Sequence, residues 1–258
     1  MAEAINSLQN EKIKNIVKLR ESSRERAIEG LFIVEGLREI ELALLAKVEI
    51  ENLYYCPTMA GDTPPLAAEN IIEVSEKVFA KISLRENPDG FLALAKIKKL
   101  ELGKLKLKAN PLLIILEAVE KPGNLGAILR TADAAGADAV IINDSKTDIY
   151  NPNVIRASQG TAFTVPTLTA SVKETLEFCN KNKIKTLATT PVADLDYTKA
   201  DFGSACAIVL GAEDKGLSQA WLEAAEEKIK INMRGRIDSL NVSVSAAIIV
   251  FEALRQRD

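Results

Sequence analysis

The chain of 258 residues contains no histidine. Histidine is the side chain whose charge changes most readily near neutral pH, and it is the commonest neutral metal ligand. Ser-His-Asp catalysis, Cys-His catalysis and His-containing zinc sites are therefore excluded. Any catalysis must use carboxylates, lysine, arginine, amides, hydroxyls or a cofactor.

Cysteine is scarce as well. The chain has three, which is an odd number, and no two of them have C-x-x-C spacing; they are Cys56, Cys179 and Cys206. Free thiols in a reducing compartment are the simplest interpretation, so we expect a cytoplasmic protein. No run reaches the roughly 18 apolar residues of a membrane span. We expect no signal peptide after Met1, because no basic segment precedes an apolar one. We therefore expect no membrane partner.

The charge balance and length set further limits. The net charge of −3 means that RNA binding would need a local basic face. A hydrophobic fraction of 47% over 258 residues is enough for one large domain or two ordinary ones.

The first half of the sequence predicts a small α/β domain over residues 1–95. Apolar residues at helical spacing continue to about Gly30. A lysine-rich stretch at 96–110 follows, which suits an exposed linker or, alternatively, a contact surface for RNA phosphates. The expected strands of this half are 32–34, 53–55, 71–74 and 91–95, with helices at 37–47 and 75–82.

The second half, residues 111–258, restarts with an apolar strand. Fully apolar strands that alternate with helices predict a parallel sheet covered on both faces. The expected strands are 112–116, 138–142, 184–189, 206–210 and 229–232, with helices at 125–135 and 241–257.

Residues 121–132 read KPGNLGAILRTA and link a strand to a helix. Arg130 lies four residues beyond Gly126, so we expect it near the N-terminal end of this helix, where anions are favoured. Read alone, the segment also fits an ordinary turn with a surface arginine. It lacks the G-x-G-x-x-G pattern of dinucleotide-binding folds.

Residues 210–218 read LGAEDKGLS and follow a buried strand. A carboxylate between two glycines at the carboxyl end of a strand lies where α/β sheets bind ligands. A polar turn without a ligand is the alternative. The third stretch reads INMRG at 231–235 and DSLNVS at 238–243, where Ser239 or Asn241 also fits as a helix N-cap.

In their order and wording, these three stretches closely resemble the signature motifs of the SpoU (TrmH) family of RNA ribose 2′-O-methyltransferases, in the SPOUT superfamily. The resemblance implies S-adenosylmethionine as cofactor, no metal, and methylation of a ribose 2′-hydroxyl in structured RNA, with ribosomal RNA favoured over transfer RNA. It also implies a parallel-sheet domain with a trefoil knot, and a homodimer whose site borrows from both subunits.

The same resemblance assigns site residues by matching positions. The family's isoleucine-proline-methionine segment reads Ile231-Asn232-Met233 here, without the proline. The matched active-site positions are Asn124, Arg130, Glu213, Ser239 and Asn241, and the matched cofactor positions are Gly211, Ile231 and Leu240.

The N-terminal half is similar to the substrate-binding domain of many family members, which looks like a ribosomal-protein fold that grips bent RNA. Arg20, Arg24 and Arg26 are the candidate phosphate contacts. Glutamates interleave with them, so a plain salt-bridged helix face remains open. A non-catalytic RNA-binding protein on the same scaffold is the alternative function, and the intact motifs argue against it.

Overall fold

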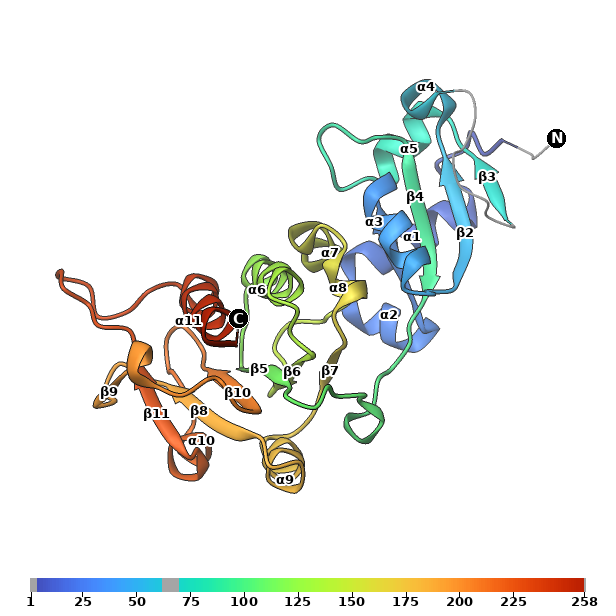
Figure 1. Cartoon of the computed structure of the whole chain (residues 1–258). Coiled ribbons are helices and arrows are strands. Elements are labelled where there is room, and N and C mark those ends of the chain that lie inside the picture. The colour runs from blue at the N-terminus through green and yellow to red at the C-terminus, as the bar shows by residue number, and fades with distance from the viewer. Residues whose placement is uncertain (1–3, 62–69, 258) are drawn as a thin grey trace. The chain divides into compact units, whose positions relative to one another are not determined.

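A computed structural model describes residues 4–61 and 70–257. The chain forms two compact units (Figure 1). Among the described residues, the first unit contains positions up to Lys98 together with the later segment Asp148–Thr164, and the second contains Lys99–Thr147 and the positions from Val165 onward. The sequence pattern predicts residues 148–164 in the second domain, whereas their packing places them in the first unit.

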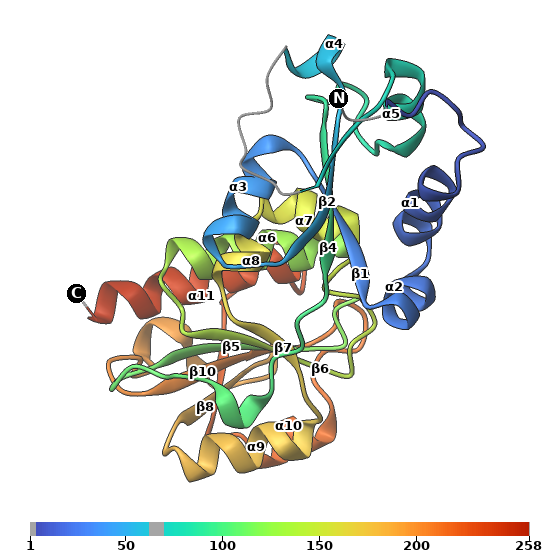
Figure 2. The same cartoon turned by 90° about the vertical axis from the view of Figure 1, so that its right-hand side faces the viewer.

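The first unit is built on a four-stranded sheet of order β1-β4-β2-β3, in which β4 pairs antiparallel with both β1 and β2. Helices α1 and α5 cover one face and α3 covers the other (Figure 2). Its elements are α1 (Glu11–Glu21), α2 (Ser23–Glu29), β1 (Leu31–Glu35), α3 (Leu37–Leu45), β2 (Ile50–Tyr55), α4 (Pro57–Ala60), β3 (Ile71–Glu73), α5 (Glu76–Ile82), β4 (Phe91–Lys96), α7 (Pro152–Ser158) and α8 (Thr161–Thr164).

The second unit is built on a seven-stranded sheet of order β7-β6-β5-β10-β8-β11-β9, and every strand pair in it is parallel. Its elements are η1 (Leu102–Lys104), β5 (Leu112–Glu117), α6 (Pro122–Ala134), β6 (Ala139–Asn143), β7 (Thr167–Thr169), α9 (Val172–Lys181), β8 (Lys185–Thr189), β9 (Leu195–Asp196), η2 (Tyr197–Lys199), β10 (Cys206–Leu210), α10 (Gln219–Ala224), β11 (Glu227–Lys230) and α11 (Val242–Arg257).

Helices cover both faces of this sheet, with α6 and α11 on one face and α9 and α10 on the other (Figure 2). The central strands β5 and β10 are fully buried, as expected for a sheet covered on both faces. The predicted α/β class with a parallel C-terminal sheet is therefore confirmed.

The lysine-rich stretch packs on the second unit through alternate leucines. Leu102, Leu105 and Leu107 contact its core, while the intervening lysines point to solvent. Lys108 donates from Nζ to the carbonyl of Gly136 at 2.9 Å. The leucine side chains thus anchor the segment that the composition predicts as an exposed linker.

Candidate functional site

Two adjacent strands bring the first two motifs together. Strands β5 and β10 pair in parallel, with Leu116 opposite Leu210. The loops that leave their carboxyl ends therefore start at the same level of the sheet. The first loop leads to Asn124 in the first turn of α6, and the second carries Glu213.

The carboxylate of Glu213 is the centre of a hydrogen-bonded cluster. Its Oε1 accepts from the side-chain amides of Asn124 and Asn241, the latter at 2.9 Å. Its Oε2 accepts from Lys121 Nζ at 2.6 Å. This hydrogen bond, and then the attraction between the two charges, raises the pKa of Lys121. Residues from all three motifs thus meet at one carboxylate, which we name the Glu213 cluster.

The side chain of Asn241 also begins helix α11. Its Oδ1 accepts from the Ser243 backbone at 2.9 Å and from the Ser243 hydroxyl at 2.6 Å. Its Nδ2 donates to Glu213 and, at 3.2 Å, to Asn124 Oδ1. The N-cap interpretation and the active-site interpretation of Asn241 are therefore compatible, because capping with the oxygen directs the nitrogen toward the cluster.

A cavity of about 350 Å³ adjoins this cluster, and Glu213 is among the residues that line it. Its size is typical of a site for a small molecule. It is bounded by the end of β8, the loop after β10 and the segment before α11. Its lining includes Thr189, Gly211, Glu213, Ser239 and Leu240.

Two features define this cavity: a wall that requires glycine and a buried hydroxyl that a polar ligand can pair with. A Cβ on Gly211 would lie 2.2 Å from the backbone carbon of Gly216, so the tight turn at the cavity wall requires glycine. Thr189 Oγ1 is buried and has no hydrogen-bond partner within the described residues. A buried hydroxyl without a partner is costly, and a bound ligand with polar groups can supply one.

The cavity contains some of the predicted cofactor and catalytic positions and not others. Gly211 and Leu240 line it as expected, whereas Ile231 is not among its lining residues. Ser239 also lines it, and its hydroxyl donates to Asp238 at 3.1 Å instead of joining the Glu213 cluster.

Arg130 lies away from the start of its helix, where its spacing from Gly126 predicts it. Helix α6 begins at Pro122, not at residue 125, because proline is well suited to the first helical position. Six residues separate Arg130 from Asn124, which is about 9 Å along the axis and about 120° around it. Arg130 is exposed, and its guanidinium makes no ion pair with the described residues.

The three N-terminal arginines differ in their surroundings. Arg20 donates to the carbonyls of Lys81 and Ser83 at 3.0 and 2.9 Å. Arg26 is 2% exposed and forms an ion pair with Asp148. A phosphate would have to displace the hydrogen bonds of Arg20 and the ion pair of Arg26. Arg24 is exposed and is the remaining candidate for a phosphate contact.

Lys121 belongs to the cluster but was not among the predicted site residues. It lies inside the first motif, directly before Pro122, and the available signal was only its place beside the matched Asn124. The unpaired hydroxyl of Thr189 could not be predicted from the sequence, because it depends on burial at the end of β8.

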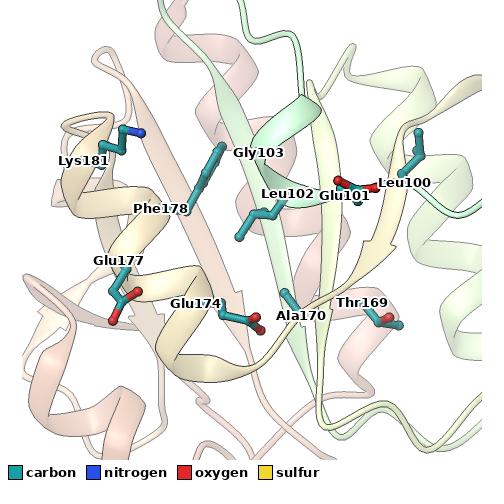
Figure 3. Close-up of a pocket in the computed structure, with 10 residues that line it drawn as sticks. All are labelled: Leu100, Glu101, Leu102, Gly103, Thr169, Ala170, Glu174, Glu177, Phe178 and Lys181. Atoms are coloured by element: carbon teal, nitrogen blue, oxygen red, sulfur yellow. The ribbon is translucent and has the colours of Figure 1, made fainter.

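Another hollow, of about 480 Å³, lies between residues 100–103 and helix α9 (Figure 3). Leu102 and Phe178 line it, and Glu174 at its edge bonds to Ser171 as part of a helix cap. It contains none of the motif residues. Across the described ranges, no helix is long and apolar enough to cross a membrane, and no group of three histidine, cysteine or acidic side chains is placed to hold a metal ion.

Comparison with protein families gives two matches. Residues 111–251 match the SpoU rRNA Methylase family, and residues 10–93 match the MRM3-like substrate binding domain. The chain is 28% identical over 247 residues to the 23S rRNA (guanosine(2553)-2′-O)-methyltransferase RlmP of Bacillus subtilis, covering 96% of this chain and 97% of that protein. It is 39% identical over 152 residues to the RlmB methyltransferase of Ralstonia nicotianae, covering 58% and 61%.

Solved structures resemble the chain over nearly its full length. A crystal structure of an RNA 2′-O ribose methyltransferase superposes with a TM-score of 0.86 at 42% identity, covering 99% of both chains. An AdoMet-bound rRNA methyltransferase from Sinorhizobium meliloti superposes with a TM-score of 0.89 at 29% identity, covering 98% of both.

Proposed function

The chain belongs to the SpoU rRNA methylase family, and we propose that it transfers a methyl group from S-adenosylmethionine to a ribose 2′-hydroxyl of ribosomal RNA. The observation that carries this proposal is the Glu213 cluster. One carboxylate joins Asn124 and Asn241 and also lines a cavity that suits the cofactor. The relatives named above, which modify 23S rRNA, support ribosomal RNA as the substrate.

The residues around the cavity divide into two groups by role. Gly211 and Leu240 form its wall, and the hydroxyl of Thr189 is available to a polar group of the cofactor. When bound, S-adenosylmethionine supplies a methyl group on a positively charged sulfur. Asn124, Glu213 and Asn241 would hold the target ribose in a fixed orientation beside the cofactor cavity, which is catalysis by positioning.

A neutral 2′-hydroxyl is a poor nucleophile, so the site must also favour loss of its proton and hold the negative charge that develops on the oxygen. Arginine stays protonated at neutral pH. We assign two roles to Arg130: it stabilises the negative charge that develops on the 2′-oxygen, and it binds the neighbouring phosphate. Ser239, at the cavity wall, contacts the ribose or the cofactor next to it.

A homodimer accounts for the position of Arg130, which lies about 120° around α6 from Asn124. Helix α11 packs against α6 and exposes Val244 and Phe251, which lie two turns apart on one face. Exposed apolar side chains of this kind suit a symmetric interface. In such a dimer, Arg130 of one subunit completes the Glu213 cluster of the other.

The first unit binds the RNA substrate, in agreement with its match to a substrate binding domain. The exposed Arg24 is its proposed phosphate contact. A ribosomal RNA substrate and three free, buried cysteines support a cytoplasmic location. The all-parallel sheet and the high structural similarity to family members support the trefoil knot.

The experiment combines binding and transfer. Calorimetry with S-adenosylmethionine and its demethylated product should show binding that persists in the presence of a chelator. Ribosomal RNA from a strain that lacks the gene should then gain 2′-O-methyl groups when incubated with protein and cofactor. If neither compound binds at millimolar concentration, the proposed function is wrong; binding without transfer to any RNA would favour a non-catalytic RNA-binding protein.

A further inference from the structure

Lys121 is the one cationic member of the Glu213 cluster. It is the N-cap residue of α6, and its Nζ lies 2.6 Å from Glu213 Oε2. The side chain is 69% exposed, whereas that of Glu213 is 30% exposed. The ammonium group therefore touches the carboxylate from the solvent side.

The two oxygens of Glu213 have separate partners. Oε1 accepts from Asn124 and Asn241, and Oε2 accepts from Lys121. A carboxylate on a flexible side chain can rotate and exchange its two oxygens. Because an ammonium group holds Oε2, Oε1 stays directed at the two amides, and a bond to a charged donor is stronger than one between neutral groups.

Stability does not account for this ion pair, because an exposed pair contributes little to folding. An ammonium group has three donors, and Glu213 uses one of them. Because the side chain is largely exposed, the remaining two are open to solvent beside the Glu213 cluster. A ribose in the site has phosphates on both its 3′ and 5′ sides, and these are the anions that would approach such donors.

We propose that Lys121 is a positioning residue that bridges Glu213 and an RNA phosphate next to the target ribose. This inference rests on the proposed function. The bridge orients the carboxylate toward Asn124 and Asn241, and it fixes the RNA backbone relative to the same carboxylate. It also keeps two negative groups, the carboxylate and the phosphate, from repelling each other.

The test compares Lys121→Met with Lys121→Arg and with the control Lys173→Met. The control removes an exposed lysine of the second unit that pairs with Glu177 at 4.0 Å and does not line the cofactor cavity. The measurements are the single-turnover rate of methyl transfer to ribosomal RNA, the affinity for that RNA at several salt concentrations, and the calorimetric affinity for S-adenosylmethionine.

We expect Lys121→Met to lower the single-turnover rate by about tenfold, which is the scale of one lost hydrogen bond to a charged group. The slope of log affinity against log salt should become shallower by about 0.7 to 0.9, the change for one lost phosphate contact. Lys121→Arg should recover most of both effects, and cofactor affinity should stay unchanged.

A double-mutant cycle with Glu213→Gln tests whether Lys121 acts through that carboxylate. The cycle is read out on RNA affinity, where the losses should be clearly less than additive, because either change breaks the same bridge. The inference is overturned if Lys121→Met keeps the full rate or the full salt slope, or if it weakens cofactor binding as much as it slows transfer. Failure of the proposed function would look different, since the unaltered protein would then transfer no methyl group.

Discussion

Arg26 and Asp148 form an ion pair although 122 residues separate them in the chain. Arg26 Nε donates to Asp148 Oδ2 at 2.7 Å, and the same guanidinium donates to the carbonyl of Leu19 at 2.5 Å. The pair joins helix α2 to the segment Asp148–Thr164, which lies between β6 and β7 in sequence and packs in the first unit. The guanidinium is thus part of the fold of that unit.

The buried arginine gives the first prediction. Arg26→Ala should lower the free energy of unfolding by about 3 kcal/mol, because it leaves Asp148 and a backbone carbonyl without their buried donor. Denaturant unfolding followed by circular dichroism measures this change. An unfolding free energy within 0.5 kcal/mol of the unaltered protein, about the range for a surface substitution, would show that the pair is not structural.

Arg24 is the matched surface arginine on the same helix. Arg24→Ala should leave the unfolding free energy almost unchanged and should reduce affinity for ribosomal RNA at low salt by removing one phosphate contact. The slope of log affinity against log salt should become shallower by about 0.7 to 0.9. Filter binding over a salt series measures both quantities. Full affinity with an unaltered slope would remove Arg24 from the RNA-binding surface.

The prediction for Arg130 concerns its proposed role across subunits. Arg130→Ala and Glu213→Gln should each nearly abolish methyl transfer, because each damages every site of a homodimer. Co-expression of the two variants should restore about a quarter of the activity, since half of the dimers would be mixed and each would keep one intact site.

The mixed-dimer result separates two arrangements of the site. If Arg130 and Glu213 of the same subunit served one site, mixed dimers of the two single variants would have no intact site, and co-expression would restore no activity. The matched control is the double variant Arg130→Ala/Glu213→Gln co-expressed with the unaltered chain. For a site within one subunit this pairing gives an active mixed dimer, whereas for a shared site both of its sites are damaged. An active mixed dimer there would contradict the shared site.

The tight turn at the cavity wall gives a prediction about the cofactor. Gly211→Ala should weaken S-adenosylmethionine binding by tenfold or more, because the added Cβ would push Gly216 and the loop that carries Glu213 out of place. The control is Gly103→Ala, since a Cβ there meets nothing within 4 Å and the residue lies outside the cavity. Calorimetry measures both affinities, and equal affinities would show that the turn does not shape the cofactor site.

Parts of this architecture follow directly from the sequence. The apolar runs at 112–116 and 206–210 predict buried parallel strands, and they became the central strands β5 and β10. The motif resemblance singled out Asn124, Glu213 and Asn241, which the structure brings into one cluster. Both signals are local, since each depends on a few neighbouring residues.

Other features depend on which surfaces meet, and the sequence does not reveal that. A helix with alternating arginine and glutamate is predicted to be exposed. Arg26 is nevertheless buried and pairs with Asp148, which is 122 positions away in the chain. Helix α9 was not predicted, although Ser171 and Glu174 form a capping box that is visible in the sequence as S-x-x-E.

The last prediction concerns the segment Asp148–Thr164, which completes the core of the first unit. Ile155 belongs to the buried cluster on the α3 face of the four-stranded sheet, and Tyr150 and Phe163 lie against Phe32 with ring centroids 4.6 and 5.9 Å away. Losing a buried side chain of this size costs about 2 to 5 kcal/mol. Loss of the buried Ile155 together with the partly buried rings of Tyr150 and Phe163 would cancel a large part of the roughly 5 to 15 kcal/mol by which a domain of this kind is stable.

A fragment of residues 1–98 should therefore fail to unfold cooperatively, whereas the same fragment followed by a glycine-serine linker and residues 148–164 should fold. Thermal unfolding by circular dichroism and amide proton dispersion in NMR spectra distinguish the two. The matched control carries Ile155→Ala and Phe163→Ala in the linked fragment. These substitutions keep the length of the fragment and remove the apolar contacts. If residues 1–98 unfold cooperatively on their own, the segment Asp148–Thr164 only covers a core that is already complete. The ion pair between Asp148 and Arg26 would then not be required for folding of the first unit.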